Sequence, residues 1–266
     1  MAAATDTAGP KAPAAGPAAY EVTNKVRLLV LSATEFETAP LRAGLADATT
    51  LPGWPPTVAG TLGDVPVLLV AGGIGKANAA AAVARRRRLA GVLQVGIGGT
   101  YPGAALELGA AVVARSEFDL DLGVGRRPAW TGLEAIGIAA FAATGGTELN
   151  RLELDHDLAN KLAVACGLVT AAFATSDSVT GDLELASVLA EQHGVGVESM
   201  EGVAAAQVAA ALGLPFAELR GMSNVVGERD KRRWQLHGAV TAACAAAAVA
   251  AGVMWGHITR VARESR

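Results

Sequence analysis

The chain has 266 residues, of which 52% are hydrophobic and 32 are glycine. It is too apolar for a disordered protein and too rich in glycine for a helical bundle, which favours an α/β protein with many tight turns. A formal net charge of −3 and only 4% aromatic residues argue against nucleic-acid binding, because a positive field and stacking side chains are both scarce. The two cysteines, Cys166 and Cys244, lie in apolar stretches and predict no disulfide framework, so we expect a cytoplasmic protein.

Two segments could suggest targeting or membrane insertion. Residues 1–24 are rich in Ala, Pro and Gly, and three prolines interrupt any apolar run, which predicts a disordered tail and not a signal peptide. Residues 239–256 are long and apolar but mostly alanine, which drives membrane insertion weakly. We therefore predict a packed terminal helix, no membrane contact, and one folded domain at residues 25–262.

Apolar runs alternate with helix-like segments along the rest of the chain. We predict strands at residues 26–31, 65–71, 92–97, 109–114, 168–174, 195–198 and 215–220. We predict helices at residues 35–45, 76–88, 155–166, 183–192, 200–212 and 235–258, and an inserted loop region at residues 116–150. This alternation predicts a single-domain, three-layer α/β/α fold whose mixed, mostly parallel central sheet binds ligands at the carboxyl ends of its strands.

Two glycine-rich turns follow predicted strands. Residues 72–76 read Gly-Gly-Ile-Gly-Lys, and such glycines can expose backbone N–H groups to an anion at a helix N-terminus. This turn has neither the P-loop nor the dinucleotide-binding spacing, and a plain tight turn is the alternative. Residues 96–100 read Gly-Ile-Gly-Gly-Thr and would let a ligand approach the backbone closely. Together the turns outline one edge of a cleft.

A third segment carries acids at a predicted strand-to-helix junction. Residues 198–202 read Glu-Ser-Met-Glu-Gly, and about twenty residues later a strand ends in the polar stretch 220–230. This pattern predicts acids and an amide at neighbouring strand ends, with solvated loop charges as the alternative. No metal is expected, because the four histidines show no metal-binding spacing with one another or with the cysteines.

The order of these motifs resembles the purine nucleoside phosphorylase and methylthioadenosine nucleosidase superfamily. The resemblance rests on residues 32–37, 73–76, 96–100, 200–202 and 220–224, and it spans about residues 26–258. Within it, residues 223–230 are similar to the futalosine hydrolase branch, which cleaves a purine base from a menaquinone precursor. The resemblance implies a cofactor-free purine nucleosidase with a small-molecule nucleoside substrate, and we expect a homo-oligomer.

The resemblance also implies roles for individual residues. Glu201 would accept hydrogen bonds from the ribose hydroxyls, and Met200 would pack against the sugar. Glu37 would position and partly deprotonate the attacking water, with Glu35 as the nearby alternative.

At the base, Asn224 stands where methylthioadenosine nucleosidases carry an aspartate. Its NH₂ could hydrogen-bond N7 or O6 of a 6-oxopurine, while Asp230 could supply an acid instead. The segment 175–180 matches one that lines the purine pocket, although Val179 replaces a stacking Phe. The residues predicted to bind substrate are Gly73, Ile74, Gly98, Gly99, Val179, Thr180, Ser199, Met200 and Asp230.

Three other functions are weighed from the sequence. Phosphorylases of the superfamily carry an arginine just after the turn that matches residues 96–99, and this chain has none there, which favours water as the nucleophile. Methylthioadenosine-type nucleosidases are the other enzymatic alternative. A non-catalytic nucleoside sensor would have no need for both Glu37 and Glu201.

Overall fold

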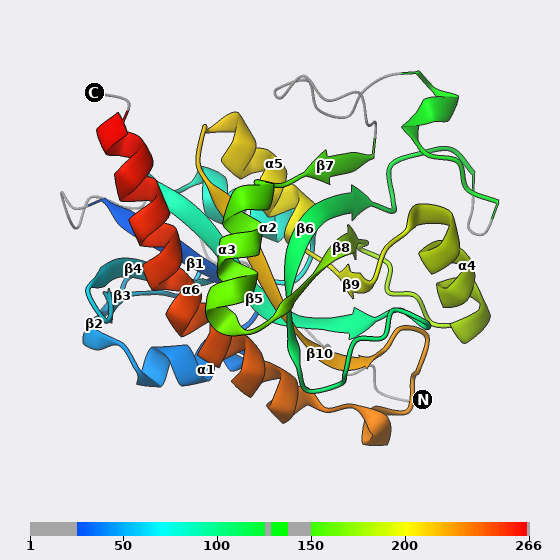
Figure 1. Ribbon diagram of the computed structural model, residues 1–266, viewed down its shortest axis with the longest axis horizontal. Helices are drawn as coiled ribbons and strands as arrows, with labels where there is room; N and C mark the ends of the chain where they lie inside the picture. Colours follow the sequence, from blue (N-terminus) through cyan, green and yellow to red (C-terminus); the bar gives the residue numbers. More distant parts are fainter. Residues whose placement is uncertain (1–25, 126–128, 138–149, 265–266) are drawn as a thin grey trace, which may run out of the picture.

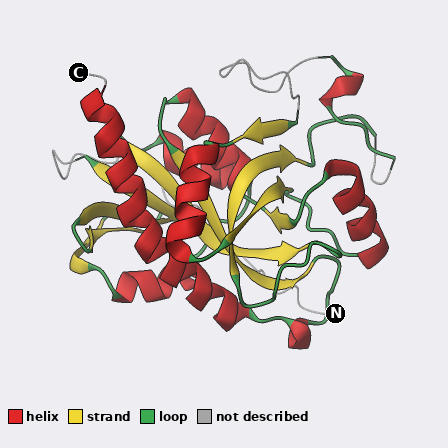
Figure 2. Ribbon diagram, viewed as in Figure 1, coloured by secondary structure: helices red, strands yellow, loops and turns green. Residues whose placement is uncertain are grey.

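A ten-stranded sheet organises the part of the chain that the structure describes, residues 26–125, 129–137 and 150–264 of a computed structural model (Figure 1). The predicted tail, residues 1–24, lies outside the described residues, as does much of the predicted inserted region. Helices pack on both faces of the sheet (Figure 2).

The strands are β1 (Arg27–Ser32), β2 (Ala46–Leu51), β3 (Thr57–Leu62), β4 (Val65–Ala71), β5 (Leu89–Thr100), β6 (Ala111–Asp119), β7 (Arg151–Glu153), β8 (Val169–Thr175), β9 (Val197–Ser199) and β10 (Phe216–Val225). The α-helices are α1 (Glu35–Ala43), α2 (Lys76–Ala84), α3 (His156–Cys166), α4 (Leu183–His193), α5 (Gly202–Ala211) and α6 (Leu236–Glu264). Two short 3₁₀ helices, η1 (Leu133–Ala135) and η2 (Lys231–Arg233), lie in connections.

The sheet runs β2-β3-β4-β1-β5 and then closes on itself. β5 pairs with both β10 and β9, and the path β10-β6-β8-β9 returns to β5, so that five strands form a ring. Five of the ten described strand pairings are parallel and five are antiparallel. The sheet is therefore mixed, but it does not have the parallel majority of pairings that we predicted, because β2, β3 and β7 add antiparallel partners.

The alternation of side chains along β1 explains the helices on both faces. Leu28 and Val30 belong to the core under α1, α3 and α6, whereas Leu29 and Leu31 pack with α2 and α5. Both sets are buried, which is why β1 reads as a continuous apolar run instead of an alternating one. Figure 1 shows α6 and α3 side by side across one face.

Helix α6 packs directly on strand β10. The segment Leu236–Val261 is long and apolar enough to cross a membrane, yet half of its apolar window is buried inside the protein. A Cβ on Gly221 of β10 would collide with the backbone carbonyl of Ala239 in α6. The predicted packed terminal helix is thus confirmed, and glycine permits its close approach to β10.

Several segments differ from the sequence-based prediction: β7 was missed, the helix predicted at residues 76–88 ends at Ala84, and two longer stretches also differ. No strand is predicted at residues 46–64, yet this stretch forms β2 and β3. β3 pairs antiparallel with β4, and β2 pairs antiparallel with β3. Residues 116–119, predicted as the start of a loop region, complete β6 and are largely buried. The buried acid Glu117 breaks the apolar pattern there, which concealed the strand.

Candidate active site

A cavity of about 410 Å³ opens at the carboxyl ends of β1, β5 and β10, beside β9. Charged, polar and apolar groups share its wall. The lining residues are Ala33, Thr34, Phe36, Glu37, Ile74, Ile97, Gly98, Gly99, Val179, Thr180, Glu198, Ser199, Met200, Glu201, Arg220, Ser223, Asn224, Val226, Arg229, Trp234 and Leu236.

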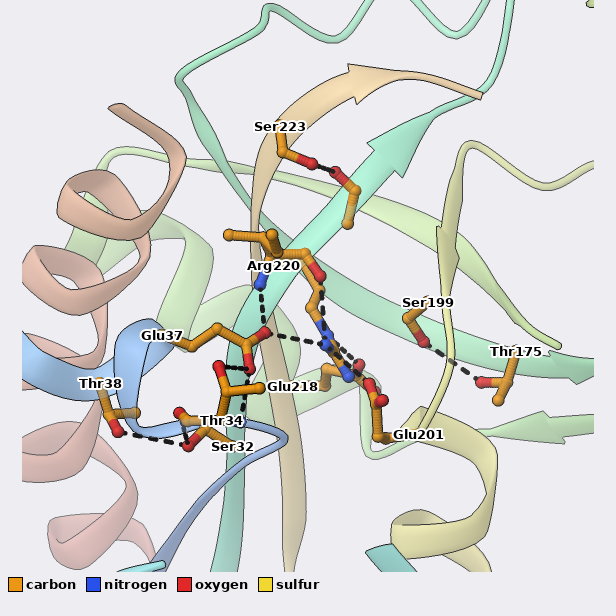
Figure 3. A network of polar contacts seen from close by, with 12 residues as sticks. Ser32, Thr34, Glu37, Thr38, Thr175, Ser199, Glu201, Glu218, Arg220 and Ser223 are labelled. Atoms are coloured by element: carbon orange, nitrogen blue, oxygen red, sulfur yellow. Dashed lines mark hydrogen bonds and ion pairs between the residues drawn. The ribbon is translucent and has the colours of Figure 1, made fainter. Parts of the chain in front are cut away.

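Arg220 of β10 is the centre of the polar network in this cavity (Figure 3). Its Nε lies 2.7 Å from Glu218 Oε1, and its NH1 lies 3.1 Å from Glu201 Oε2 and 3.9 Å from Glu37 Oε1. NH1 also donates to the carbonyl oxygen of Ile97 at 3.2 Å. Burial alone would lower the pKa of Arg220, but the three carboxylates raise it, so the guanidinium stays charged while fully buried.

Glu37 is held rigidly at the start of α1. Its Oε2 accepts hydrogen bonds from the backbone N–H and the hydroxyl of Thr34, at 2.8 and 3.0 Å, in a capping box. Its Oε1 accepts from the N–H of Ile97 at 3.0 Å, and a Cβ on Gly96 would collide with this oxygen. The alternative, Glu35, is exposed, pairs with Arg42 at 3.3 Å and does not line the cavity.

Glu201, the residue before α5, is held by the first glycine-rich turn. The N–H of Gly75 donates to Glu201 Oε1 at 3.1 Å, and the next N–H, of Lys76, donates to Asp177 Oδ1 at 2.9 Å. Gly75 has φ +94°, a conformation that a side chain would strain. The anions held by this turn are therefore carboxylates of the protein itself.

The opposite part of the wall is formed by the end of β10. The hydroxyl of Ser223 donates to Asn224 Oδ1 at 2.8 Å, and Asn224 Nδ2 donates to the carbonyl of Val225 at 2.9 Å. The pairing of β10 with β5 shifts register between Met222 and Asn224, so Ser223 forms a bulge. A bulge of this kind turns two successive side chains towards one cavity.

Glu198 supports the segment that carries Val179 and Thr180. Its Oε1 accepts from the N–H of Thr180 at 3.0 Å, and its Oε2 accepts from the hydroxyls of Thr180 and Tyr101 at 2.6 and 2.9 Å. All three side chains are buried. Sequence reasoning noticed Glu198 as an acid beside Met200 but assigned it no role, because its partners are far away in the chain.

Most of the predicted site residues line this one cavity. These are Glu37, Ile74, Gly98, Gly99, Val179, Thr180, Ser199, Met200, Glu201 and Asn224. Gly73 does not line it, and its N–H donates to the carbonyl of Ala33 at 2.9 Å. Asp230 does not line the cavity either: its carboxylate caps η2 and pairs with exposed Arg232 at 2.7 Å.

Sequence reasoning missed the cation and the aromatic rings of the cavity wall. Arg220 lies in the polar stretch 220–230, but its buried position among acids follows only from the fold. Near the opening, the guanidinium of Arg229 lies 5.3 Å from the centre of the Trp234 ring, and both line the cavity with Phe36. Across the described residues, no group of three or more His, Cys, Asp or Glu side chains is arranged to hold a metal ion.

Comparison with known proteins places this chain in a family. Residues 27–254 match the model of the phosphorylase superfamily. Futalosine hydrolase from Thermus thermophilus is 40% identical over 173 residues, which cover 64% of this chain and 74% of that relative. Futalosine hydrolase from Streptomyces coelicolor is 32% identical over 183 residues, with 65% and 74% covered. The chain belongs to the futalosine hydrolase family of the phosphorylase superfamily.

Solved structures show the same fold. A methylthioadenosine/S-adenosylhomocysteine nucleosidase from Colwellia psychrerythraea, in complex with adenine, aligns with a TM-score of 0.73 at 22% identity, covering 86% of this chain and 96% of that chain. Futalosine hydrolase from Helicobacter pylori aligns with a TM-score of 0.70 at 17% identity, covering 87% and 98%. Members of this fold family thus share the frame on which the cavity is built.

Proposed function

We propose that this chain hydrolyses the N-ribosidic bond of futalosine, releasing hypoxanthine and dehypoxanthine futalosine in menaquinone biosynthesis. Its membership of the futalosine hydrolase family supports the substrate. The observation that carries the reaction type is the arrangement of Glu37 and Glu201, two buried cavity carboxylates held by the same guanidinium of Arg220.

Cleavage of an N-ribosidic bond builds positive charge on the ribose and negative charge on the departing purine. A carboxylate beside the sugar stabilises this transition state more than the ground state, because the charge on the ribose develops only during bond breaking. Glu201 is suited to accept hydrogen bonds from the two ribose hydroxyls, since contacts with Gly75 and Arg220 fix the orientation of its carboxylate. Met200 supplies an apolar contact to the sugar from the same wall.

Glu37 is suited to position the attacking water. Thr34 and Ile97 donate to its two oxygens and fix the carboxylate at the cavity wall, and proton abstraction requires such a fixed acceptor within hydrogen-bond reach. Exposed Glu35 offers no comparable geometry, and we assign this role to Glu37 alone.

At the other end of the bond, Asn224 is suited to bind the leaving base. An amide NH₂ can donate to N7 or O6 of hypoxanthine as charge develops there, although it cannot transfer a proton as an acid would. Thr180 and Val179 border the same region, with Glu198 holding their segment in place.

The charge of the cavity favours water over phosphate as the nucleophile. Glu37, Glu198 and Glu201 line the wall. Of the two arginines there, Arg220 already contacts the carboxylates of Glu218, Glu201 and Glu37, and Arg229 lies beside the Trp234 ring. A phosphate dianion would meet strong repulsion there, since desolvated like charges interact over short distances with little screening.

The opening of the cavity is suited to an anionic aromatic group on the sugar. Futalosine carries a benzoate at that end, and Arg229 would pair with its carboxylate while Trp234 and Phe36 contact the ring. Finer properties belong to the same proposal: a cytoplasmic, metal-free and cofactor-free enzyme that assembles as a homo-oligomer and binds neither nucleic acid nor membranes.

The proposal is tested by identifying the products from a panel of nucleosides. We expect free hypoxanthine and a reducing sugar from futalosine, at the same rate with and without phosphate in the buffer. Aminodeoxyfutalosine, inosine and methylthioadenosine should be poorer substrates. A sugar 1-phosphate as the main product would overturn the hydrolase assignment, and a preference for methylthioadenosine would overturn the substrate.

A further inference from the structure

Beneath the cavity, two glutamates lie side by side in the protein interior. Glu117 of β6 and Glu218 of β10 are both fully buried. Both carboxyl groups approach Gly202, the first residue of α5. A Cβ added to this glycine would collide with Glu117 Oε1 and with Glu218 Oε2, so these two oxygens lie close together beside it. Neither oxygen has a hydrogen-bond donor among the described groups.

The other oxygen of each carboxyl is already satisfied. Glu117 Oε2 accepts from the hydroxyl of Thr175 at 2.7 Å, and Glu218 Oε1 accepts from Arg220 Nε at 2.7 Å. Two ionised carboxylates in contact would repel each other in this dry interior, and each would leave one oxygen without a donor. A single proton between the two facing oxygens removes both problems at once.

The surroundings decide which glutamate holds that proton. Arg220 contacts Glu218 directly and stabilises its charge, whereas Glu117 has only a hydroxyl as a polar partner. Burial and then the negative charge of Glu218 raise the pKa of Glu117 well above its ordinary range. The proton therefore resides on Glu117.

The groups that face Glu117 from its other neighbours are neutral. β8 contributes Thr175, and α5 contributes the backbone of Gly202 and Val203, whose N–H donates to the Thr175 hydroxyl at 2.9 Å. Ser199 of β9 lies 3.4 Å from that hydroxyl. The charged neighbours are Glu218 and Arg220 of β10.

We propose that Glu117 is an un-ionised acid that donates a hydrogen bond to Glu218, and that this pair positions Arg220 and, through it, Glu201. Glu117 and Glu218 are positioning residues, because neither lines the cavity. Glu218 holds the Nε side of the guanidinium, which leaves NH1 directed at Glu201 and Glu37. The effect on the sugar rests on the role of Glu201 under the proposed function.

Three substitutions separate the effect of charge at Glu117 and Glu218 on activity from the effect of side-chain shape. Glu117→Gln keeps a donor for Glu218 and an acceptor for Thr175, and we expect kcat/KM within about twofold of the parent enzyme. Glu117→Leu removes both contacts and should lower kcat about tenfold or more, so that the amide rescues what the apolar residue loses. Glu218→Gln removes the charge beside Arg220 and should cost at least about tenfold in kcat.

A substrate-free readout tests the proton itself. The infrared spectrum of the parent at neutral pH should contain the C=O stretch of an un-ionised carboxyl that disappears in Glu117→Gln. Because the folded state binds this proton more tightly than the unfolded state, stability should fall as pH rises from the ordinary carboxyl range towards the raised pKa of Glu117. Glu117→Gln should lack this fall, while Glu153→Gln, at an exposed site on neighbouring β7, should retain it.

The outcomes are distinct. An absent infrared band, a loss of about tenfold or more in Glu117→Gln, or full activity of Glu218→Gln would overturn the inference. The infrared result requires only the parent protein and Glu117→Gln, so a failure of Glu117→Leu to fold does not affect it. If the band is present but futalosine is not cleaved, the proposed function fails while the protonated pair stands.

Discussion

The backbone N–H of Gly75 donates a 3.1 Å hydrogen bond to the carboxylate of Glu201, which lies 126 residues further along the chain. Glycine turns at helix N-termini are suited to bind phosphate, and here the bound anion is a side chain of the protein. The same carboxylate contacts buried Arg220 from its other oxygen. A phosphate that bound to this N–H would have to displace Glu201.

Neutralising Glu201 should impair catalysis strongly. Glu201→Gln keeps the shape of the side chain but removes the charge that favours a cationic ribose, a loss of about 3 kcal/mol or roughly a hundredfold in kcat. Base release from futalosine measures the effect. Activity within a factor of two of the parent would contradict the role of Glu201.

The two acids at the start of α1 should differ sharply. Glu37→Gln should reduce kcat by about a hundredfold or more, because the fixed acceptor for the attacking water loses its charge. Glu35→Gln is the matched control, since Glu35 is exposed and pairs with Arg42 outside the cavity. Equal losses of kcat in the two variants, both measured at saturating substrate, would show that Glu37 has no specific catalytic role.

The residue at position 224 should control the choice of base. An amide that donates to O6 favours a 6-oxopurine, and mispairing of one buried polar contact costs about 1–3 kcal/mol, roughly ten to a hundredfold in kcat/KM. Asn224→Asp should lower activity on futalosine and narrow or reverse its advantage over the 6-amino analogue. A ratio of the two kcat/KM values that the substitution leaves unchanged would mean that another group recognises the base.

Arg229 should select substrates by the charge of the group on their sugar. Arg229→Met should lower kcat/KM for futalosine about tenfold or more, the range expected for a lost hydrogen bond between charged groups, and leave inosine unaffected. Arg232→Met is the matched control, because Arg232 pairs with Asp230 outside the cavity wall. Parallel losses on futalosine and inosine would exclude recognition of the carboxylate.

Two glycines should respond in opposite directions to alanine. In Gly221→Ala the new Cβ would collide with the carbonyl of Ala239, and the overpacked contact should cost about 1–3 kcal/mol or more of stability. In Gly252→Ala, at an exposed position of helix α6 with open space around it, the better helix propensity should add up to about 1 kcal/mol. Urea unfolding measures both, and a Gly221→Ala protein as stable as the parent would refute the close packing of α6 on β10.

The sequence indicated those strands whose residues are apolar throughout. The predicted strand at 65–71 coincides with β4, because burial on both faces produces an unbroken apolar run. β2 was missed because Ala46–Leu51 is exposed along nearly its whole length and shows no such run. β10 extends five residues beyond its prediction, since Gly221 and the polar pair Ser223 and Asn224 read as a turn.

For the site, sequence motifs located residues at strand ends, but they did not reveal the buried polar contacts that hold these residues in place. Glu37, Glu201 and Asn224 were predicted from the resemblance and do line one cavity. Arg220 and Glu117 could not be given a role from the sequence, because a charged residue in a strand pattern ordinarily indicates exposure. Their charged and polar partners include residues far away in the chain, Glu37 and Glu201 for Arg220 and Thr175 for Glu117, which only the fold brings together.

The bulge at Ser223 divides β10 into two parts under different constraints. Before it, Glu218 and Arg220 are tied to buried carboxylates, and a change at either would disturb charges shared among several strands. After it, the side chain of Asn224 forms hydrogen bonds, among the described residues, with its chain neighbours Ser223 and Val225. Under the proposed function, a lineage could therefore exchange Asn224, the residue proposed to contact the base, and keep the acids proposed to bind the sugar, so that new base preferences would arise by single substitutions at this strand end.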